Sequence, residues 1–440
     1  MKLLKKLFAL SLAVTLLQNI SFCPVQTAFA EGIPAVETED LPHSGTCGEN
    51  VTWEFDETSG LLTVSGTGTM DSAPWGGLPL KTVEIQEGVT SIADYAFYFQ
   101  GGLTSVTIPE GVTRIGSFAF SVCSSLEAPV FPQSLKYIGG SAFAGCGAFT
   151  SVTLPEGLEI ISGSAFTDCA LLEEIQIPDS VSVMGASVFA RTPLFENQSG
   201  IKYADGWVIG CDETVTSAIL PDGTKGICPM AFMNCSELSE ISIPDSVKYI
   251  GLMAFDGCIS LPKENIGGIT YIDNWAVSAQ SELSPSMVLD KHTRGLAANL
   301  FYGCTFRTMD IPASVKYINP EAFSTCLNLE SVIIRNPDCV IDMTDDYSRT
   351  ISNLAKTVTE YYFTGILYGE ENSTAQAYAE KYDITFKPIS ELPSEPDPCD
   401  LNHDGVVNAQ DAGFILMYAA EVGAGNFTGT VAEYILTLSQ

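Results

Sequence analysis

Basic side chains are scarce in this chain of 440 residues, which has 20 Lys and Arg against 53 Asp and Glu. The formal net charge of −33 gives a surface that repels nucleic acid and anionic membranes, so we expect neither as a partner. Solubility accounts for this acidity more simply than a specific cationic partner does. Histidine is scarcer still, because His43, His292 and His403 are the only three and no nucleophile motif surrounds them.

The scarcity of reactive motifs argues against an enzyme without removing that alternative. A glycoside hydrolase needs a cleft with two opposed carboxylates. The acidic residues of the repeated segments fall mainly at turns, where solvated faces are expected, as with Glu110, Glu156, Asp179 and Asp245. We therefore rank a hydrolase below a binding protein.

Long apolar runs are confined to residues 1–30. A basic start with three lysines precedes the apolar run 7–17, and Ala28-Phe29-Ala30 matches an A-x-A cleavage site. An N-terminal membrane anchor is the alternative, which is disfavoured because the run is short and ends at Gln18. The pattern predicts a secretory signal and hence a secreted, extracellular protein. We expect no membrane span in the rest of the chain.

A phenylalanine recurs with a period of 23 residues through the middle of the chain. The unbroken series is followed by further members after two interruptions: Phe97, Phe120, Phe143, Phe166, Phe189, then Phe232, Phe255, Phe301 and Phe323. A fixed period of this length indicates stacked repeats, in which no unit buries its apolar face alone. A scaffold or binding surface is therefore the first functional hypothesis.

Each repeated unit contains two short alternating segments. In VTIPEGVTRIG the first segment, VTI, is ended by Pro and a turn, and a second short strand follows. The stretch S-x-AF-x-x-C is too short for a full helix, so we expect a helical or 3₁₀ turn there. An α-helical solenoid needs about 33 residues per repeat, which excludes it. The prediction is a mainly β, parallel-stranded solenoid with short helical turns.

Cysteines keep the same period as the phenylalanines. Seven of the 13 cysteines stand three residues after a periodic Phe: Cys123, Cys146, Cys169, Cys235, Cys258, Cys304 and Cys326. In a solenoid their Cβ vectors run roughly parallel, whereas a disulfide needs them to converge. We predict a ladder of buried free thiols, which behave as small hydrophobes.

Two interruptions break the period in the same way, at residues 203–232 and 271–301. They place Trp207 and Trp275 at matching positions. An inserted tryptophan most often fills the core of a widened coil, which is the interpretation we favour. The alternative is that the pair forms an exposed ligand surface.

The units resemble the bacterial surface-antigen type of leucine-rich repeat (family 5), whose pattern is close to L-x-x-I-x-IP-x-x-V-x-x-I-x-x-x-AF-x-x-C. The resemblance covers residues 80–340. It implies a curved solenoid on a secreted or surface protein that binds a protein or glycan ligand, or acts as an adhesin, without fixed catalytic residues. Residues 45–79 are similar to an opening β cap, and residues 341–387 to an irregular coil and closing cap, in which Ser373 opens a short helix.

The C-terminal part changes composition at a Pro-rich linker, residues 388–399. The next twelve residues fit a calcium-binding EF-hand loop, with Gly405 at the sharp turn. The expected calcium ligands are Asp400, Asn402, Asp404, Val406 through its carbonyl, Asn408 and Asp411. His403 points outward in such a loop and is not counted as a ligand.

Residues 400–440 resemble a type I-like dockerin of half length, a small α-helical module. The loop closed by Asp411, the apolar helix after it and the preceding linker carry the resemblance, but the second calcium loop is missing. The resemblance implies docking onto a cohesin domain of a scaffoldin, within a cellulosome-like complex for polysaccharide breakdown. The implied partner-contacting residues are Ala409, Gln410, Leu416 and Tyr418. Two alternatives remain, a dockerin-borne hydrolase and a surface adhesin whose calcium module is only a cap.

Overall fold

The computed structural model describes residues 42–341, 349–355 and 361–392. No helix among them is long and apolar enough to cross a membrane. The predicted signal segment, the linker after residue 392 and the calcium loop lie outside the described residues.

The described chain starts with an antiparallel cap. Strands β1 (Ser44–Gly48), β2 (Val51–Asp56) and β3 (Leu61–Gly66) form a meander in which side chains of β2 are alternately buried and exposed. Strands β2 and β3 flank the turn at residues 57–60 and lie within residues 45–79, where the sequence predicted an opening β cap. Strand β3 then pairs in parallel with β5 (Thr82–Ile85), so the cap joins the solenoid without an open edge.

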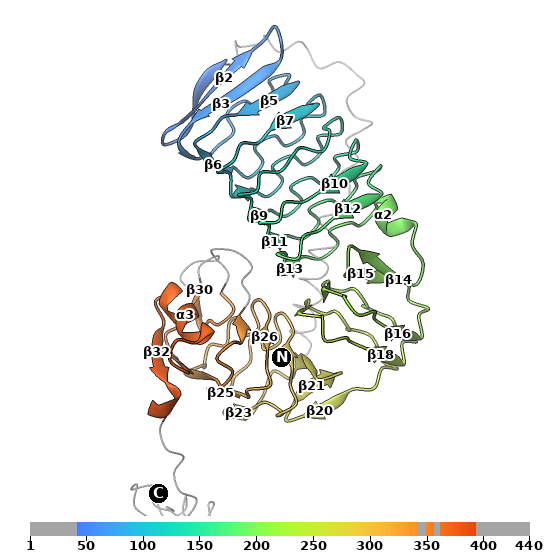
Figure 1. The fold of residues 1–440 in the computed structure, drawn as a ribbon, viewed down its shortest axis with the longest axis vertical. Helices are drawn as coiled ribbons and strands as arrows, with labels where there is room; N and C mark the ends of the chain where they lie inside the picture. Colours follow the sequence, from blue (N-terminus) through green and yellow to red (C-terminus); the bar gives the residue numbers. More distant parts are fainter. Residues whose placement is uncertain (1–41, 342–348, 356–360, 393–440) are drawn as a thin grey trace, which may run out of the picture.

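Most regular coils contribute one short strand to each of two rows (Figure 1). The outer row lies on the convex side of the curved path: β5, β7 (Ser105–Thr107), β10 (Ser151–Thr153), β12 (Glu174–Gln176), β16 (Ser217–Ile219), β18 (Glu240–Ser242), β23 (Ser286–Val288), β25 (Thr308–Ile311) and β27 (Ser331–Ile334). The inner row lies on the concave side: β6 (Val89–Ile92), β8 (Arg114–Ile115), β9 (Tyr137–Ile138), β11 (Ile160–Ile161), β13 (Val183–Met184), β17 (Gly226–Ile227), β19 (Tyr249–Ile250), β24 (Gly295–Leu296), β26 (Tyr317–Ile318) and β28 (Val340–Ile341). A further two-residue strand, β4 (Gly68–Thr69), precedes β6.

The outer row is interrupted in one of the regular coils. Pro129 stands one period after Val106, the middle residue of β7, and has no N–H to donate to a neighbouring strand. Strands β7 and β10 therefore belong to separate sheets, and Val130 between them is 89% exposed.

The third side of each coil, which we call the turn row, differs from the sequence prediction. The segment around the periodic Phe is a series of turns and not a helical or 3₁₀ turn. The residues two before and two after each periodic Phe have positive φ, as in Phe118 at 56° and Val122 at 62°. This left-handed conformation costs about 1–2 kcal/mol for a residue with a side chain, and glycine is the residue that usually adopts it. Few of these positions are glycine, so the left-handed turns had no signal in the sequence, and the prediction of a helical or 3₁₀ turn was wrong.

Hydrogen bonds between coils offset that cost. The N–H groups of Phe118, Phe120 and Val122 donate to carbonyls of the next coil at 2.9, 2.7 and 2.6 Å, and the same pattern recurs in the neighbouring coils. Each left-handed residue turns its N–H toward the next coil, so the turn row is a third ladder along the solenoid.

The core is a column of stacked aromatic rings. Trp75 lies 5.5 Å from Phe97, and the column continues through Phe120, Phe143 and Phe166 to Phe189 at centroid distances of 5.0 to 6.0 Å. Trp75 thus holds the position of the periodic Phe one coil earlier, and its Nε1 donates to the carbonyl of Ala96 at 2.6 Å. Each buried ring contributes about 1.5–3 kcal/mol of burial free energy, so the column stabilises the stacking of the coils.

The periodic cysteines lie beside this column. All seven are buried and free, as predicted, and there is no disulfide among the described residues. The Sγ of Cys123 donates to the carbonyl of Phe97 at 3.1 Å, and Cys146 and Cys169 repeat this contact one and two coils later. The thiol thus bonds to a buried backbone oxygen of the preceding coil and otherwise packs as a small hydrophobic side chain.

A helix closes the other end of the solenoid. Helix α3 (Thr374–Lys381) begins where the sequence predicted, with the Oγ of Ser373 accepting the N–H of Gln376 at 3.3 Å. Its buried Tyr378 accepts the N–H of Ile351 at 3.2 Å. The last strands, β31 (Ile366–Gly369) and β32 (Thr385–Pro388), extend the outer row in parallel. Short strands β29 (Leu354–Ala355) and β30 (Tyr361–Tyr362), and the short helices α2 (Pro193–Glu196) and η1 (Ile389–Glu391), complete the described elements.

Candidate ligand-binding surface

The two interruptions are inserted β-strands that divide the inner row into three blocks. The first adds the hairpin of β14 (Ile201–Ala204) and β15 (Trp207–Cys211), and the second adds β20 (Glu264–Ile266), β21 (Ile269–Ile272) and β22 (Trp275–Ala279). The inserted strands β15 and β22 then resume parallel pairing with β17 and β24. Each interruption is therefore a joint between blocks of coils.

Trp207 and Trp275 fill the core of these joints. Their exposed fractions are 1% and 0%, so the alternative that they form an exposed ligand surface is wrong. Trp207 packs 5.7 Å from Tyr249, and Trp275 stacks on Tyr317 at 6.2 Å. The favoured interpretation, a tryptophan that fills a widened coil, is confirmed.

Glycines make room for both rings. A Cβ on Gly226 would lie 2.5 Å from Cζ3 of Trp207, and a Cβ on Gly295 would lie 2.4 Å from Cζ3 of Trp275. Gly226 pairs with Trp207 and Gly295 with Trp275 in the register of the inner row. In both joints the indole occupies the space that a side chain on the next strand would take if the residue there were not glycine.

The polar contacts of the two joints also match. In the first, Asp205 accepts the N–H of Ile177 at 2.6 Å, and Lys225 donates to the carbonyl of Ile177 at 2.7 Å. In the second, Asp273 accepts the N–H of Ile243 at 2.6 Å. Arg294 takes the role of Lys225, donating to the carbonyls of Pro244 and Val247 at 2.7 and 2.9 Å.

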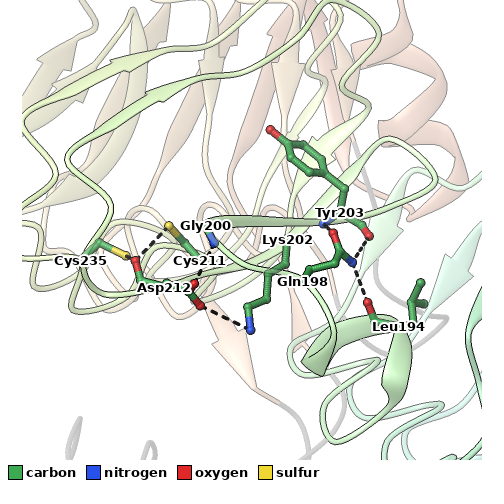
Figure 2. Close-up of polar contacts among 8 residues, drawn as sticks. All are labelled: Leu194, Gln198, Gly200, Lys202, Tyr203, Cys211, Asp212 and Cys235. Carbon is green, nitrogen blue, oxygen red and sulfur yellow. Dashed lines mark hydrogen bonds and ion pairs between the residues drawn. The ribbon is translucent and has the colours of Figure 1, made fainter.

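The first joint carries a second set of contacts, shown in Figure 2. The side chain of Gln198 bonds the backbone N–H and C=O of Tyr203 at 2.9 and 2.8 Å. Asp212 accepts the N–H of Gly200 at 2.7 Å and pairs with Lys202 at 3.5 Å. These contacts fix the hairpin to the segment before it, so we assign the cluster a structural role.

The second joint forms a polar hollow lined by Lys263, Asp273, Asp290, His292 and other residues. Two of its acidic side chains are engaged with backbone groups. Asp273 and Asp290 both accept backbone N–H groups, at 2.6 and 2.8 Å. Chiefly because of the bond from His292 N–H, the pKa of the Asp290 carboxyl is lowered, whereas a general acid needs a raised pKa.

The inner row carries a line of basic side chains that the sequence analysis did not identify. Each stands immediately before an inner-row strand: Lys136, Lys225, Lys248, Arg294 and Lys316. Glu159 and Ser182 hold this position before β11 and β13, so the line is interrupted between Lys136 and Lys225. Arg114 lies at the neighbouring position and sits 4.0 Å over the ring of Tyr137. The recurring Lys-Tyr-Ile triplets at 136, 248 and 316 were a visible signal of this line.

Acidic side chains neutralise part of this line. Lys136 pairs with Glu159 at 2.9 Å, Lys225 with Asp179 at 2.9 Å and Arg294 with Asp245 at 3.2 Å. Lys248 and Lys316 are exposed and form no ion pair with any described residue. They are the ammonium groups of the inner row that are open to a ligand.

The predicted calcium site cannot be placed on this surface. Its six ligands, Asp400 to Asp411, and the docking residues Ala409, Gln410, Leu416 and Tyr418 lie outside the described residues. Within residues 42–341, 349–355 and 361–392 there is no group of three or more His, Cys, Asp or Glu that could hold a metal ion.

The chain was compared with known proteins. The family described as "BspA type Leucine rich repeat region" matches in six copies, over residues 75–195 and 210–330. Similar solved structures include a leucine-rich repeat protein from Eubacterium ventriosum ATCC 27560 (19% identity, 72% of this chain and 91% of that chain, TM-score 0.35). Another is a leucine-rich repeat protein from Bacteroides ovatus ATCC 8483 (18% identity, 78% of this chain and 98% of that chain, TM-score 0.30). No curated protein matches.

The matched residues begin at Trp75, the first ring of the aromatic column, and they divide near the first joint. They cover more than half of the 440 residues. The two strand rows, the stacked rings and this match together lead to one conclusion: the chain belongs to the BspA-type leucine-rich repeat family.

Proposed function

We propose that this protein is a secreted, non-catalytic binding protein whose inner row of strands binds a protein ligand through acidic side chains of that ligand. The observation that carries the proposal is the line of basic side chains on the inner row of an otherwise acidic chain. Of its members, Lys248 and Lys316 form no ion pair with a described residue, and they stand just before β19 and β26, on either side of the second joint. An extended acidic segment that crosses these strands could therefore meet both ammonium groups.

Family membership supports the non-catalytic part of the proposal. Leucine-rich repeat solenoids are built to present extended surfaces, and function is then decided by the residues on them. The polar clusters of the two joints are engaged with backbone groups. A screen for polysaccharide turnover with the full chain tests the alternative hydrolase, and any turnover that survives purification would contradict a purely binding role.

The test of the ligand surface uses poly-L-glutamate as the probe, at about 0.15 M salt. The Debye length is then about 8 Å, so that distant acidic residues contribute little. We expect the double variant Lys248→Gln/Lys316→Gln to bind the probe at least about tenfold more weakly, since about 1.4 kcal/mol of lost charge pairing corresponds to this factor.

The matched control is Lys81→Gln/Lys381→Gln, which removes the same charge from exposed positions outside the inner row, before the outer-row strand β5 and in helix α3. It should bind poly-L-glutamate like the unaltered chain. Equal weakening in both variants would show that only net charge matters and would overturn the proposal. Tighter binding of polygalacturonate than of poly-L-glutamate would point to an acidic glycan instead.

We also propose that residues 400–440 bind one calcium ion and dock onto a cohesin domain, which would recruit the protein to a cellulosome-like complex or a cell surface. The support is the sequence pattern alone: Asp400, Asn402 and Asp404 precede Gly405 at the loop positions that calcium requires. Calorimetry with calcium tests the first part, with Asp404→Ala expected to abolish binding and Asp383→Ala as the control. A panel of cohesins with and without chelator tests the second part. Absence of any calcium-dependent partner would reduce the module to a structural cap.

A further inference from the structure

Four aromatic side chains gather on the turn row of the first two regular coils. Tyr95, Tyr98 and Phe99 are 55%, 48% and 71% exposed, and Phe118 is half-buried. Their ring contacts join them into one cluster: Tyr95 stacks on Phe118 at 4.9 Å, Tyr98 meets Tyr95 edge-on at 5.8 Å, and Phe99 lies 6.1 Å from Tyr98. We call these four residues the aromatic patch.

The repeat itself shows that the fold does not require aromatic residues here. Tyr95 and Phe118 stand two residues before a periodic Phe, where the next three coils have Ser141, Ser164 and Ser187. Phe99 stands two residues after, where Gly145 and Asp168 occur one and two coils beyond Val122. The backbone conformation is the same in all of these coils, with positive φ.

The aromatic residues are also disfavoured at these positions by the backbone. Positive φ is rare for bulky side chains, and φ is 58° at Tyr95, 64° at Phe99 and 56° at Phe118. Strained residues that nevertheless form an exposed apolar cluster mark an interaction site, because neither the core nor the backbone gains from them.

We propose that the aromatic patch is a docking site for a second protein, one whose contact surface is apolar and rimmed by lysine or arginine. Tyrosine and phenylalanine are enriched in the centres of protein interfaces. The acidic Asp94 directly precedes Tyr95 and accepts the N–H of Ser117, the residue before Phe118, at 2.7 Å, and the chain as a whole carries a formal charge of −33. A basic rim therefore complements its surroundings, whereas anionic membranes, nucleic acid and a second copy of the chain are repelled.

The geometry of the rings favours a protein over a glycan. A sugar ring docks on an open aromatic face, but Tyr95 and Phe118 turn one face of each ring toward the other, with 5° between their planes. Tyr98 adds an edge-on contact and not a parallel platform. The patch thus offers ring edges and a rounded apolar surface, which suits apolar side chains of a partner.

The proposed docking site is separate from the inner row, so its test does not depend on binding of acidic ligands. The probe is a fluorescent 14-residue helical peptide of leucine and lysine, and binding to the full chain is followed by anisotropy. In the variant Tyr95→Ser/Phe118→Ser each aromatic residue is replaced by the residue of the neighbouring coils. We expect at least about tenfold weaker peptide binding, which is about 1.4 kcal/mol, with an unchanged unfolding midpoint and unchanged poly-L-glutamate binding.

Two further variants keep the test decisive. Tyr98→Ser removes a ring at a position of ordinary φ, so weaker binding there does not depend on tolerance of the left-handed backbone. Tyr302→Ser removes a tyrosine that is 58% exposed at the same position of another coil, and it should bind the peptide normally. Unchanged binding in both patch variants would overturn the proposal. So would patch-dependent binding of a leucine–glutamate peptide or of a neutral glucan.

Discussion

At the scale of single residues, the positions of a few small side chains determine where the large rings lie. Gly226 and Gly295 leave the space that Trp207 and Trp275 occupy. The same glycine–tryptophan pairing occurs at both joints, so it is a repeated feature of the fold. The buried thiols act in the same way, since each fills a gap beside the aromatic column and bonds to a carbonyl.

The glycine rule gives a direct prediction for stability. In Gly226→Ala the new methyl group would overlap the Trp207 ring, so either the ring or the strand must shift. We expect a loss of about 1–3 kcal/mol in the free energy of unfolding, as in other overpacked cores. Chemical denaturation measures it. Gly76→Ala is the control, because a Cβ there meets nothing within 4 Å. Equal stability of the two variants would contradict the packing of Trp207.

The thiols give a pH dependence with a defined sign. Burial raises the pKa of Cys123 and Cys169 to about 12 and that of Cys258 to about 11, from an ordinary value of 9.0. Because the unfolded thiols ionise first, the unfolded chain binds fewer protons between pH 9 and 12. The thiol contribution to stability is therefore complete below pH 9 and is lost as pH rises toward 12.

Thermal unfolding at pH 8 and pH 10.5 measures this loss. The double variant Cys123→Ala/Cys169→Ala should lose less stability between these two pH values than the unaltered chain does. An identical loss in both would mean that these thiols are already ionised, or are accessible, in the folded protein.

At the scale of elements, the solenoid consists of three hydrogen-bonded ladders, namely the outer row, the inner row and the turn row, and two of them are interrupted at defined places. Pro129 breaks the outer row in one coil, and the two joints break the inner row between blocks. At each joint an aspartate and a basic residue bond to the backbone of the preceding coil, so that the backbone groups freed by the broken ladder keep partners. The joints thus preserve stacking while they add new strands.

This role predicts that Asp205 contributes more to the free energy of unfolding than other acidic residues near it in the chain. Asp205→Ala leaves the N–H of the buried Ile177 without a partner, and we expect a loss of about 1–3 kcal/mol in the free energy of unfolding. Asp222→Ala, at an exposed turn, should change it by about 0.5 kcal/mol or less. Urea titration compares them, and a loss no larger for Asp205→Ala would show that the joint does not depend on this bond.

At the scale of the whole molecule, the curved solenoid separates structural residues from exposed ones. The periodic Phe and Cys residues are in the core, whereas the inner row and the aromatic patch carry side chains that stacking does not need. Metal removal should follow the same division. Because no metal-binding cluster exists in the described ranges 42–341, 349–355 and 361–392, we expect a chelator to leave the main unfolding midpoint unchanged. A large downward shift would show that calcium also supports the solenoid.

Much of this architecture was predictable because stacking forces a period on the sequence. The strands around Pro109, the buried thiols and the Ser373 cap followed from spacing and residue type. The left-handed turns did not, because serine and phenylalanine give no local signal of positive φ, and hydrogen bonds between coils impose it. The inner basic line was missed because Lys248 and Lys316 look like ordinary exposed residues until the register places them beside Lys225 and Arg294 on the neighbouring strands.

The central claim is that ligands carrying carboxylates bind along the inner row. Zero-length carbodiimide coupling of poly-L-glutamate to the protein, followed by peptide mapping, tests it directly, because an amide forms fastest where a lysine is already held against a carboxylate. We expect coupling at Lys248 and Lys316, which stand just before the inner-row strands β19 and β26. Coupling at Lys263, Lys291 or Lys381 in preference to these two would contradict it.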